Sequence, residues 1–519
     1  MLLVFCFPLS REDINHILMP KYILKNSTWP TTPSYNQFYQ MEKNSIDVLF
    51  LGSSVAVNSF SPQEIYNEYG IRSYNLGSEQ QSIFLSYFWL KEALRFQSPQ
   101  AVVLDTRFLF EIHQNTPINT TEGLTRKCLD PMRWSEVKRE AVSDLCRIDE
   151  RQSEISYYLK NIRFHTRWSE LTEYDILYHE TQYSELKGYA AIPEYGGVTY
   201  ASYHFAGDME VRQETHEIMQ IYLDKIVEQC KAADILLVLV SLPGNPMSDA
   251  YHNTLTEYAQ DHGIDYYNMC ETELYNSIGA VLLRENMIGH ANLWGAIKTS
   301  RYVGSLLANK YQIGAVRDEQ YEATREYYEH IIKNCELAHI TDMSEYLQEI
   351  KDDHYTIFIA AKDEATRGLS EEIKENLKYL GLETDLSGKY RWSYAAVISP
   401  ENGVSESLTE NDPASLSGSI RNHNTFYIIT SCGWTAGTTS SIQIEGREYC
   451  RNTRGLNFVI YDNDLMKVID RVTFDTYEAC KAVRKKICDI AGAACFGAGS
   501  ASCMSGIMSC TSSAFSAIL

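Results

Sequence analysis

Short apolar segments recur along the first 310 residues of this 519-residue chain, and each ends in small or polar residues. They are too short to be helices, and their β-branched and aliphatic side chains favour buried strands. Between them lie longer stretches with apolar residues at helical spacing. This alternation predicts an α/β fold, a three-layer doubly wound parallel sheet. The expected strands are residues 47–51, 71–77, 101–105, 235–240 and 265–267.

The length allows two or three domains with substantial cores. We expect a lead-in at 1–43, an α/β domain at 44–310 with an insertion at about 112–205, and a helical linker at 311–351. A second, smaller mixed α/β domain is expected at 352–478, followed by a low-complexity tail at 479–519. The expected strands of this second domain are 356–361, 394–398, 425–430, 441–445 and 456–461, with a helix at 370–380 and a loop at 399–415.

Composition excludes several classes of protein. The net charge of −22 argues against nucleic acid as a partner, and disfavours anionic lipid surfaces without a further anchor. The 13 cysteines show neither a Cys-x-x-Cys pair nor zinc spacing, so we expect no metal site and no disulfide framework. Nucleotide-binding glycine loops and the Gly-x-Ser-x-Gly elbow are missing from the sequence, and we expect no cofactor.

One candidate site follows the first strand, at Gly52-Ser53-Ser54. Small residues permit a tight turn there and place a hydroxyl at the carboxyl end of the strand, where open α/β sheets bind ligands. A following helix would direct its N–H groups to the same place, which suits a developing oxyanion. Taken alone, the tripeptide also fits an ordinary polar turn.

Further candidates for substrate contacts lie on the next strands and in the insertion. Asn75 is on the strand that ends at Gly77, and Arg107 follows the strand 101–105 as a candidate cationic donor. A long insertion at the carboxyl edge of a sheet often carries specificity. There, His165, Arg167 and Trp168 are candidates to line a groove, with Trp168 as a platform for a sugar ring. Ordinary packing or surface roles are the alternative for each.

Two segments together resemble the SGNH (GDSL-type) hydrolase superfamily. They are Gly52-Ser53-Ser54 and His290-Ala291-Asn292-Leu293-Trp294-Gly295-Ala296, which opens an amphipathic helix. The second is typical of members related to polysaccharide O-acetyltransferases, and the resemblance covers about residues 44–310. It implies that Ser54 is a nucleophile and His290 its general base. It also implies that the N–H groups of Ser54 and Gly77 bind the oxyanion, although Gly77 alone also fits a plain turn.

The chain departs from the SGNH pattern at three places. Ser53 replaces the Asp of the first block, and Met287 replaces the Asp expected three residues before His290. Either Glu285, Asn286 or a carbonyl orients the imidazole instead, or the site is a Ser–His dyad, or it has lost activity. The third departure is Asp105-Thr106-Arg107, which stands where the family has Gly-x-Asn-Asp.

The resemblance implies a serine esterase or O-acyltransferase acting on acyl, in the first instance acetyl, esters of extracellular or cell-surface glycans. Water as the acceptor gives hydrolysis and a sugar hydroxyl gives transfer. The alternative is a non-catalytic glycan-binding or scaffold protein with a degenerate site. Because such relatives are commonly membrane-anchored, we expect an extracytoplasmic protein with residues 1–43 as the remnant of an anchor. The apolar run Met1–Phe7 is itself too short to span a bilayer.

Three later segments resemble the interleukin-like EMT inducer (PANDER-like) domain. They are residues 431–434, 452–462 and 473–477, and the resemblance spans about 352–478. It implies an accessory binding domain, since some such domains are linked to glycan recognition. A packing or oligomerisation module is the alternative, and the sequence does not indicate an oligomeric state.

Overall fold

A computed structural model gives the fold of the chain. It describes residues 31–113, 116–169, 185–193, 206–243, 247–279, 286–287, 290–420, 425–478 and 480–484. The expected lead-in up to residue 30 and the tail beyond 484 lie outside these residues. The chain forms two compact units, divided between Cys335 and Glu336. Each unit is described by itself.

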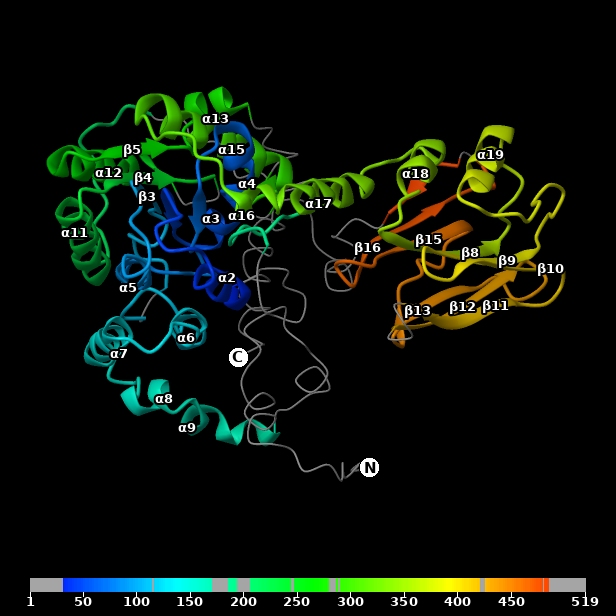
Figure 1. Cartoon of the computed structure of the whole chain (residues 1–519), viewed down its shortest axis with the longest axis horizontal. Helices are drawn as coiled ribbons and strands as arrows, with labels where there is room; N and C mark the ends of the chain where they lie inside the picture. Colours follow the sequence, from blue (N-terminus) through cyan, green and yellow to red (C-terminus); the bar gives the residue numbers. More distant parts are fainter. Residues whose placement is uncertain are drawn as a thin grey trace. The chain divides into compact units, whose positions relative to one another are not determined.

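A parallel sheet organises the first unit, with its strands in the order β2-β1-β3-β4-β5, of which Figure 1 labels β3, β4 and β5. The strands are β1 (Val48–Leu51), β2 (Ser73–Asn75), β3 (Ala101–Asp105), β4 (Leu236–Ser241) and β5 (Asp265–Asn268). They lie at the predicted places. The chain passes outward from β1 to β2 and returns past β1 to β3, so the strand order reverses between β1 and β3. In such sheets the crevice at this switch point, beyond the carboxyl ends of the strands, is where ligands bind.

Both faces of this sheet are buried, which explains the continuous apolar runs of its strands. Leu49 and Leu51 of β1 face one hydrophobic core, and Val48 and Phe50 face the other, because successive side chains alternate across a strand. Helices α2, α5 and α11 pack on the first face, and α3, α4 and α15 on the second.

The helices of the first unit are α2 (Thr31–Phe38), α3 (Ser54–Ser59), α4 (Pro62–Tyr69), α5 (Ile83–Ala93), α6 (Glu122–Leu129), α7 (Glu136–Ile148), α8 (Glu154–Tyr158), α9 (Lys160–Phe164), α11 (Glu217–Ala232), α12 (Asp249–His262), α13 (Thr272–Ile278), α15 (Leu293–Ser305) and α16 (Glu319–Glu322). Shorter elements are the 3-10 turn η1 (His165–Ser169), the π-helical turn η2 (Leu306–Lys310) and the hairpin of β6 (Asn286–Met287) and β7 (His290–Ala291). Helix α17 (Arg325–Leu337) spans the division between the units.

Two segments expected to lie outside the domains pack into their cores. Helix α2 falls within the expected lead-in, yet Tyr35 is buried and stacks on Trp89 with ring centroids 3.9 Å apart. The expected linker is divided between the units. Tyr321 is buried in the first unit and donates to Ser73 O at 2.7 Å, whereas Tyr346 belongs to the core of the second unit.

The second unit is a curled, mixed sheet with helices on one side (Figure 1). Strand β8 pairs antiparallel with β9 and β15, and its end pairs parallel with β12. Its elements are α18 (Met343–Glu349), β8 (Tyr355–Asp363), α19 (Glu371–Tyr379), β9 (Ser393–Ser399), β10 (Gly403–Thr409), β11 (Ala414–Ile420), β12 (Thr425–Gly433), β13 (Ser440–Ile444), β14 (Arg447–Glu448), β15 (Gly455–Asp462), β16 (Lys467–Phe474) and β17 (Ala482–Val483).

The expected loop at 399–415 is instead largely a strand, which corrects the prediction. Residues 403–409 form β10 and pair along their whole length with β9, and β11 begins at Ala414. Strand β10 has no fully buried residue. Its sequence, with serine, glutamate and glycine, therefore lacks the apolar pattern that predicts a buried strand. Strand β16 was also not predicted, although it pairs with β15 from Lys467 to Phe474.

Disulfides and membrane-spanning helices do not occur in the part of the chain that the structure describes. The cysteines outside any disulfide there are Cys128, Cys146, Cys230, Cys270, Cys335, Cys432, Cys450 and Cys480. Within the same residues, no helix combines the length and the apolar character that crossing a bilayer requires.

Candidate active site

The turn after β1 brings Ser54 into hydrogen-bonding contact with His290, 236 residues further along the chain. Ser54 is the first residue of α3, and His290 lies on β7 just before α15. Ser54 Oγ and His290 Nε2 are 2.9 Å apart, and the hydroxyl donates when Nε2 is unprotonated. A hydroxyl and an imidazole within this distance are the arrangement of a nucleophile and its general base.

The turn that presents Ser54 depends on the two residues before it, Gly52 and Ser53. Gly52 has φ +148°, and a Cβ at this position would lie 2.4 Å from Asp105 Cβ, so only glycine fits. Ser53 caps α3, because its hydroxyl accepts from Val55 N at 3.3 Å. The chain therefore changes from strand to helix within three residues and leaves Ser54 at the carboxyl end of β1.

His290 is held by a hairpin on one side and a helix cap on the other. Met287 and His290 pair across β6 and β7, and Asn292 caps α15 by accepting from Gly295 N at 3.1 Å. Residue 287 supplies no carboxylate to the imidazole. Of the replacements considered, Glu285 and the side chain of Asn286 lie outside the described residues.

A short part of the insertion, residues 185–193, connects the elements around this pair. Lys187 O accepts from Asn75 N at 3.0 Å, and Ala190 N donates to Val57 O at 3.2 Å. Ile192 O accepts from Leu293 N at 2.9 Å, three residues after His290. Segment 185–193 therefore joins β2, the helix of Ser54 and the helix that follows His290.

Gly77 and Asn75 lie near Ser54, but they bond to each other. Gly77 N donates to Asn75 Oδ1 at 3.1 Å, and Asn75 Nδ2 donates to Ala56 O at 2.9 Å and to Phe60 O at 3.1 Å. Asn75 is fully buried, so its amide holds α3 against the end of β2. The N–H of Gly77 is therefore already bonded to a side chain of the protein.

The other candidate substrate residues have different positions. Arg107 is half-buried two residues after the end of β3, and its N–H donates to Asp105 Oδ1 at 3.1 Å. His165 is exposed, with Nδ1 2.8 Å from Ile162 O, and Figure 1 places α9 and the turn after it away from α3. Arg167 and Trp168 share η1 with His165, and their side chains are not among those described. The structure thus brings Arg107, but not His165, to the carboxyl edge of the sheet near Ser54.

One residue beside Ser54 was not predicted as part of the site. Asp105 is the last residue of β3 and is only 2% exposed. Its Oδ2 accepts from Ser53 Oγ at 2.7 Å. A signal was present in the sequence, since a carboxylate ends the strand 101–105 and the carboxyl ends of parallel strands share one edge of the sheet.

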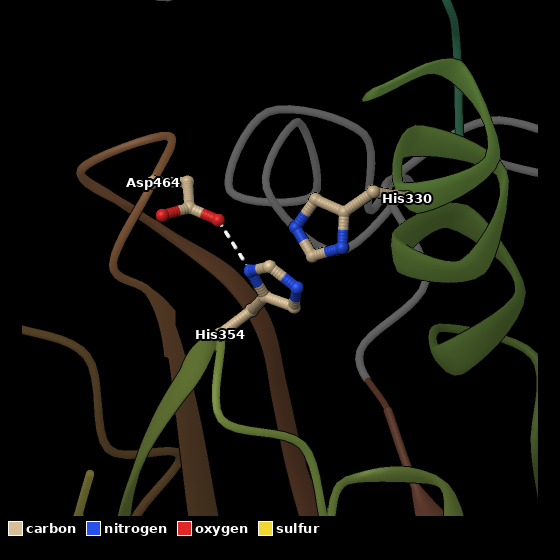
Figure 2. Close-up of side chains that lie close together, drawn as sticks. All are labelled: His330, His354 and Asp464. Carbon is tan, nitrogen blue, oxygen red and sulfur yellow. Dashed lines mark hydrogen bonds and ion pairs between the residues drawn. The ribbon is translucent and has the colours of Figure 1, made fainter. Parts of the chain in front are cut away.

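A separate polar pair lies in the second unit. Figure 2 shows His354, just before β8, with its Nδ1 hydrogen-bonded to the carboxylate of Asp464, just after β15. His330, drawn in the same view, belongs to α17 and to the first unit. The pair from the second unit supplies two ligand groups, whereas zinc sites in proteins use at least three.

Comparison with known proteins identifies one part of the chain. Residues 310–399 match the family described as Interleukin-like EMT inducer. The match overlaps the predicted domain over 352–399 and begins earlier than expected, whereas the segments 431–434, 452–462 and 473–477 lie beyond it. No family match supports the SGNH resemblance of residues 44–310, and no curated protein matches the chain. The protein therefore combines a parallel α/β unit, which carries the Ser54–His290 pair, with an interleukin-like EMT inducer-like domain.

Proposed function

We propose that the first unit is a serine esterase or O-acyltransferase of SGNH type, acting on acyl esters of glycans. The observation that carries this proposal is the 2.9 Å contact between Ser54 Oγ and His290 Nε2. The pair lies at the carboxyl end of β1, beside the switch point of the sheet. A nucleophile within reach of a base, at the edge of the sheet where ligands bind, supports acyl transfer.

The geometry supports the following reaction. His290 takes the proton of Ser54 as Oγ attacks the acyl carbonyl carbon, and it returns the proton to the departing sugar oxygen. Ser54 then carries the acyl group until water or another sugar hydroxyl attacks it. The N–H of Ser54, at the first position of α3, has no acceptor within its own helix and serves as a donor to the oxyanion.

The substrate class and the location come from the family resemblance of the sequence. The glycan and the acetyl group come from the resemblance of the Ser54 and His290 segments to polysaccharide O-acetyltransferase relatives. The extracytoplasmic location, with an anchor upstream of residue 44, comes from the same resemblance. The interleukin-like EMT inducer match at 310–399 supports an accessory role in binding for the second unit.

The test uses the full chain and p-nitrophenyl acetate. We expect hydrolysis by the wild type and a loss of at least about 100-fold in Ser54→Ala and in His290→Ala, since each group is needed in the same step. Ser59→Ala on the same helix and His262→Ala on α12 are the matched controls and should keep wild-type rates. Activity that survives both site substitutions would contradict the proposal, and acetylated glycans follow as substrates if it holds.

A second candidate function is favoured by the contacts of Gly77. Its N–H is bonded to Asn75 Oδ1, and Met287 stands opposite His290, so the site lacks two groups that the SGNH pattern supplies. This favours a non-catalytic protein that binds glycans through its second unit. An inactive wild type that binds glycans in calorimetric titrations would decide for this function.

A further inference from the structure

We propose that Asp105, acting through the hydroxyl of Ser53, is a positioning residue for Ser54. The inference rests on the proposed function, since it concerns how the same serine is held for its reaction. Asp105 contacts Ser53 and Arg107 N, and its role is to fix the turn from which Ser54 projects.

The position of Asp105 follows from the sheet. Strands β1 and β3 are parallel neighbours with Leu51 beside Leu104, so Asp105 lies next to Gly52 at the carboxyl edge. The contact is close, because a Cβ on Gly52 would overlap Asp105 Cβ. The backbone of the turn is therefore packed directly against this carboxylate side chain.

The carboxylate is hydrogen-bonded to both sides of the turn. Asp105 Oδ2 accepts from Ser53 Oγ at 2.7 Å and from Ser53 N at 3.3 Å, while Oδ1 accepts from Arg107 N at 3.1 Å. A carboxylate that is 2% exposed is costly to bury unless such donors compensate it. These bonds thus fix the orientation of Asp105 as well as that of Ser53.

Ser53 passes this restraint to Ser54. Its hydroxyl donates to Asp105 Oδ2 and accepts from Val55 N at 3.3 Å, so its side chain is held from both ends. Ser54 lies between Ser53 and Val55 in the chain, and both neighbours belong to this network. The orientation of Ser54 Oγ toward His290 then depends on a hydrogen bond that neither catalytic residue makes.

The test measures how fast the full-length protein reacts with a fluorophosphonate probe. Ser54 Oγ forms a bond to phosphorus, the P–F bond breaks, fluoride leaves and His290 takes the proton. We expect Asp105→Asn and Ser53→Ala to react about 100-fold more slowly, the effect expected of a misplacement of about 1 Å. Ser53→Thr keeps the hydroxyl and should react at nearly the wild-type rate.

A reciprocal exchange separates positioning from general loss of structure. Ser53→Asp alone places a second carboxylate against Asp105, and like charges at this distance repel, so the reaction should be slow. In Ser53→Asp combined with Asp105→Asn, the new amide donates to the new carboxylate, which also caps α3. We expect this double variant to recover at least about 10-fold over Ser53→Asp, because one charge-assisted hydrogen bond is restored.

The outcomes distinguish this inference from the function on which it rests. If the wild type reacts and Ser53→Ala, at an unchanged melting temperature, reacts equally fast, positioning by Asp105 is overturned and the proposed function stands. Failure of the double variant to recover, when it is folded, also overturns it. If the folded wild type itself does not react, the proposed function fails and this inference falls with it. Should Asp105→Asn not fold, the Ser53 variants alone decide the question.

Discussion

At the scale of single residues, the first unit buries several cationic side chains. Lys187, in segment 185–193, is buried, and its Nζ donates to Thr324 Oγ1 at 2.6 Å. Its Nζ also lies 4.3 Å from the centroid of the Tyr321 ring. Burial lowers the pKa of Lys187 to about 8 because the ammonium loses its water there.

This shift predicts how the contribution of Lys187 to stability depends on pH. Between about pH 8 and about pH 10.4 the unfolded chain keeps the proton of Lys187 longer than the folded protein does. The free energy of unfolding of the wild type, relative to Lys187→Met, should therefore rise through this range by up to about 1.4 kcal/mol per pH unit. Urea titrations at several pH values measure it.

The control for this prediction is the exposed Lys231, as Lys231→Met. This substitution removes a lysine whose side chain is exposed in the folded protein. A free-energy difference for Lys187→Met that stays constant over this pH range would show that the folded and unfolded states bind the proton of Lys187 alike.

At the scale of elements, segment 185–193 connects the strand and the two helices that surround Ser54 and His290. It carries hydrogen bonds to β2, to α3 and to α15, which are separate in the chain. The segment approaches β2 most closely at Gly188, which has φ +88°. A Cβ at this position would lie 1.8 Å from Asn75 O. Such an approach admits only glycine, because any side chain would overlap the backbone of β2.

Gly188→Ala should accordingly lower both stability and activity. The overlap with Asn75 O must push segment 185–193 away from β2, and the bonds of this segment to Val57 and Leu293 should weaken with it. Hydrolysis of p-nitrophenyl acetate should fall by at least about 10-fold, as expected when a nucleophile and base are displaced. Chemical denaturation measures the accompanying loss of stability.

Gly263→Ala is the matched control for this substitution. Gly263 also has a positive φ of +64°, but nothing lies within 4 Å of its Cβ position. The substitution Gly263→Ala should lower the free energy of unfolding only by the backbone strain, about 1–2 kcal/mol, and leave the activity unchanged. A Gly188 variant no worse than this control would mean that segment 185–193 can move without consequence.

At the scale of the whole molecule, each unit has hydrophobic cores of its own. In the second unit, Phe458 is fully buried and packs edge-on against Phe474, with ring centroids 5.8 Å apart. In the first unit, Phe88 is fully buried in the core beneath α5. The core side chains of the second unit are therefore separate from those of the unit that carries the Ser54–His290 pair.

Phe458→Ala should destabilise the second unit while the folded first unit keeps its activity. Removing a buried phenyl group costs about 3–5 kcal/mol. We expect calorimetry to show a lowered transition for the second unit, with kcat for p-nitrophenyl acetate unchanged at 25 °C. Phe88→Ala should instead lower the transition of the first unit. Loss of activity in folded Phe458→Ala would show that the site depends on the second core.

Local pattern was sufficient for much of the first unit. The strands β1 to β5 and the amphipathic helix α15 were predicted because their apolar spacing is a property of neighbouring residues. Pattern was insufficient where pairing, not burial, makes a strand. Residues 403–409 have no buried side chain, and they form β10 because β9 satisfies their backbone hydrogen bonds.

The sequence alone was enough to propose Ser54 and His290, since each lies in a motif readable from a few residues. Their 2.9 Å contact, the hold of Asp105 on Ser53 and the bond from Gly77 to Asn75 depended on the tertiary structure. The first two join residues far apart in the chain, and the third forms in a turn packed against α3. Local propensity governs which residues become strands and helices, whereas the partner of a buried polar group is decided by what the folded chain brings within about 3 Å of it.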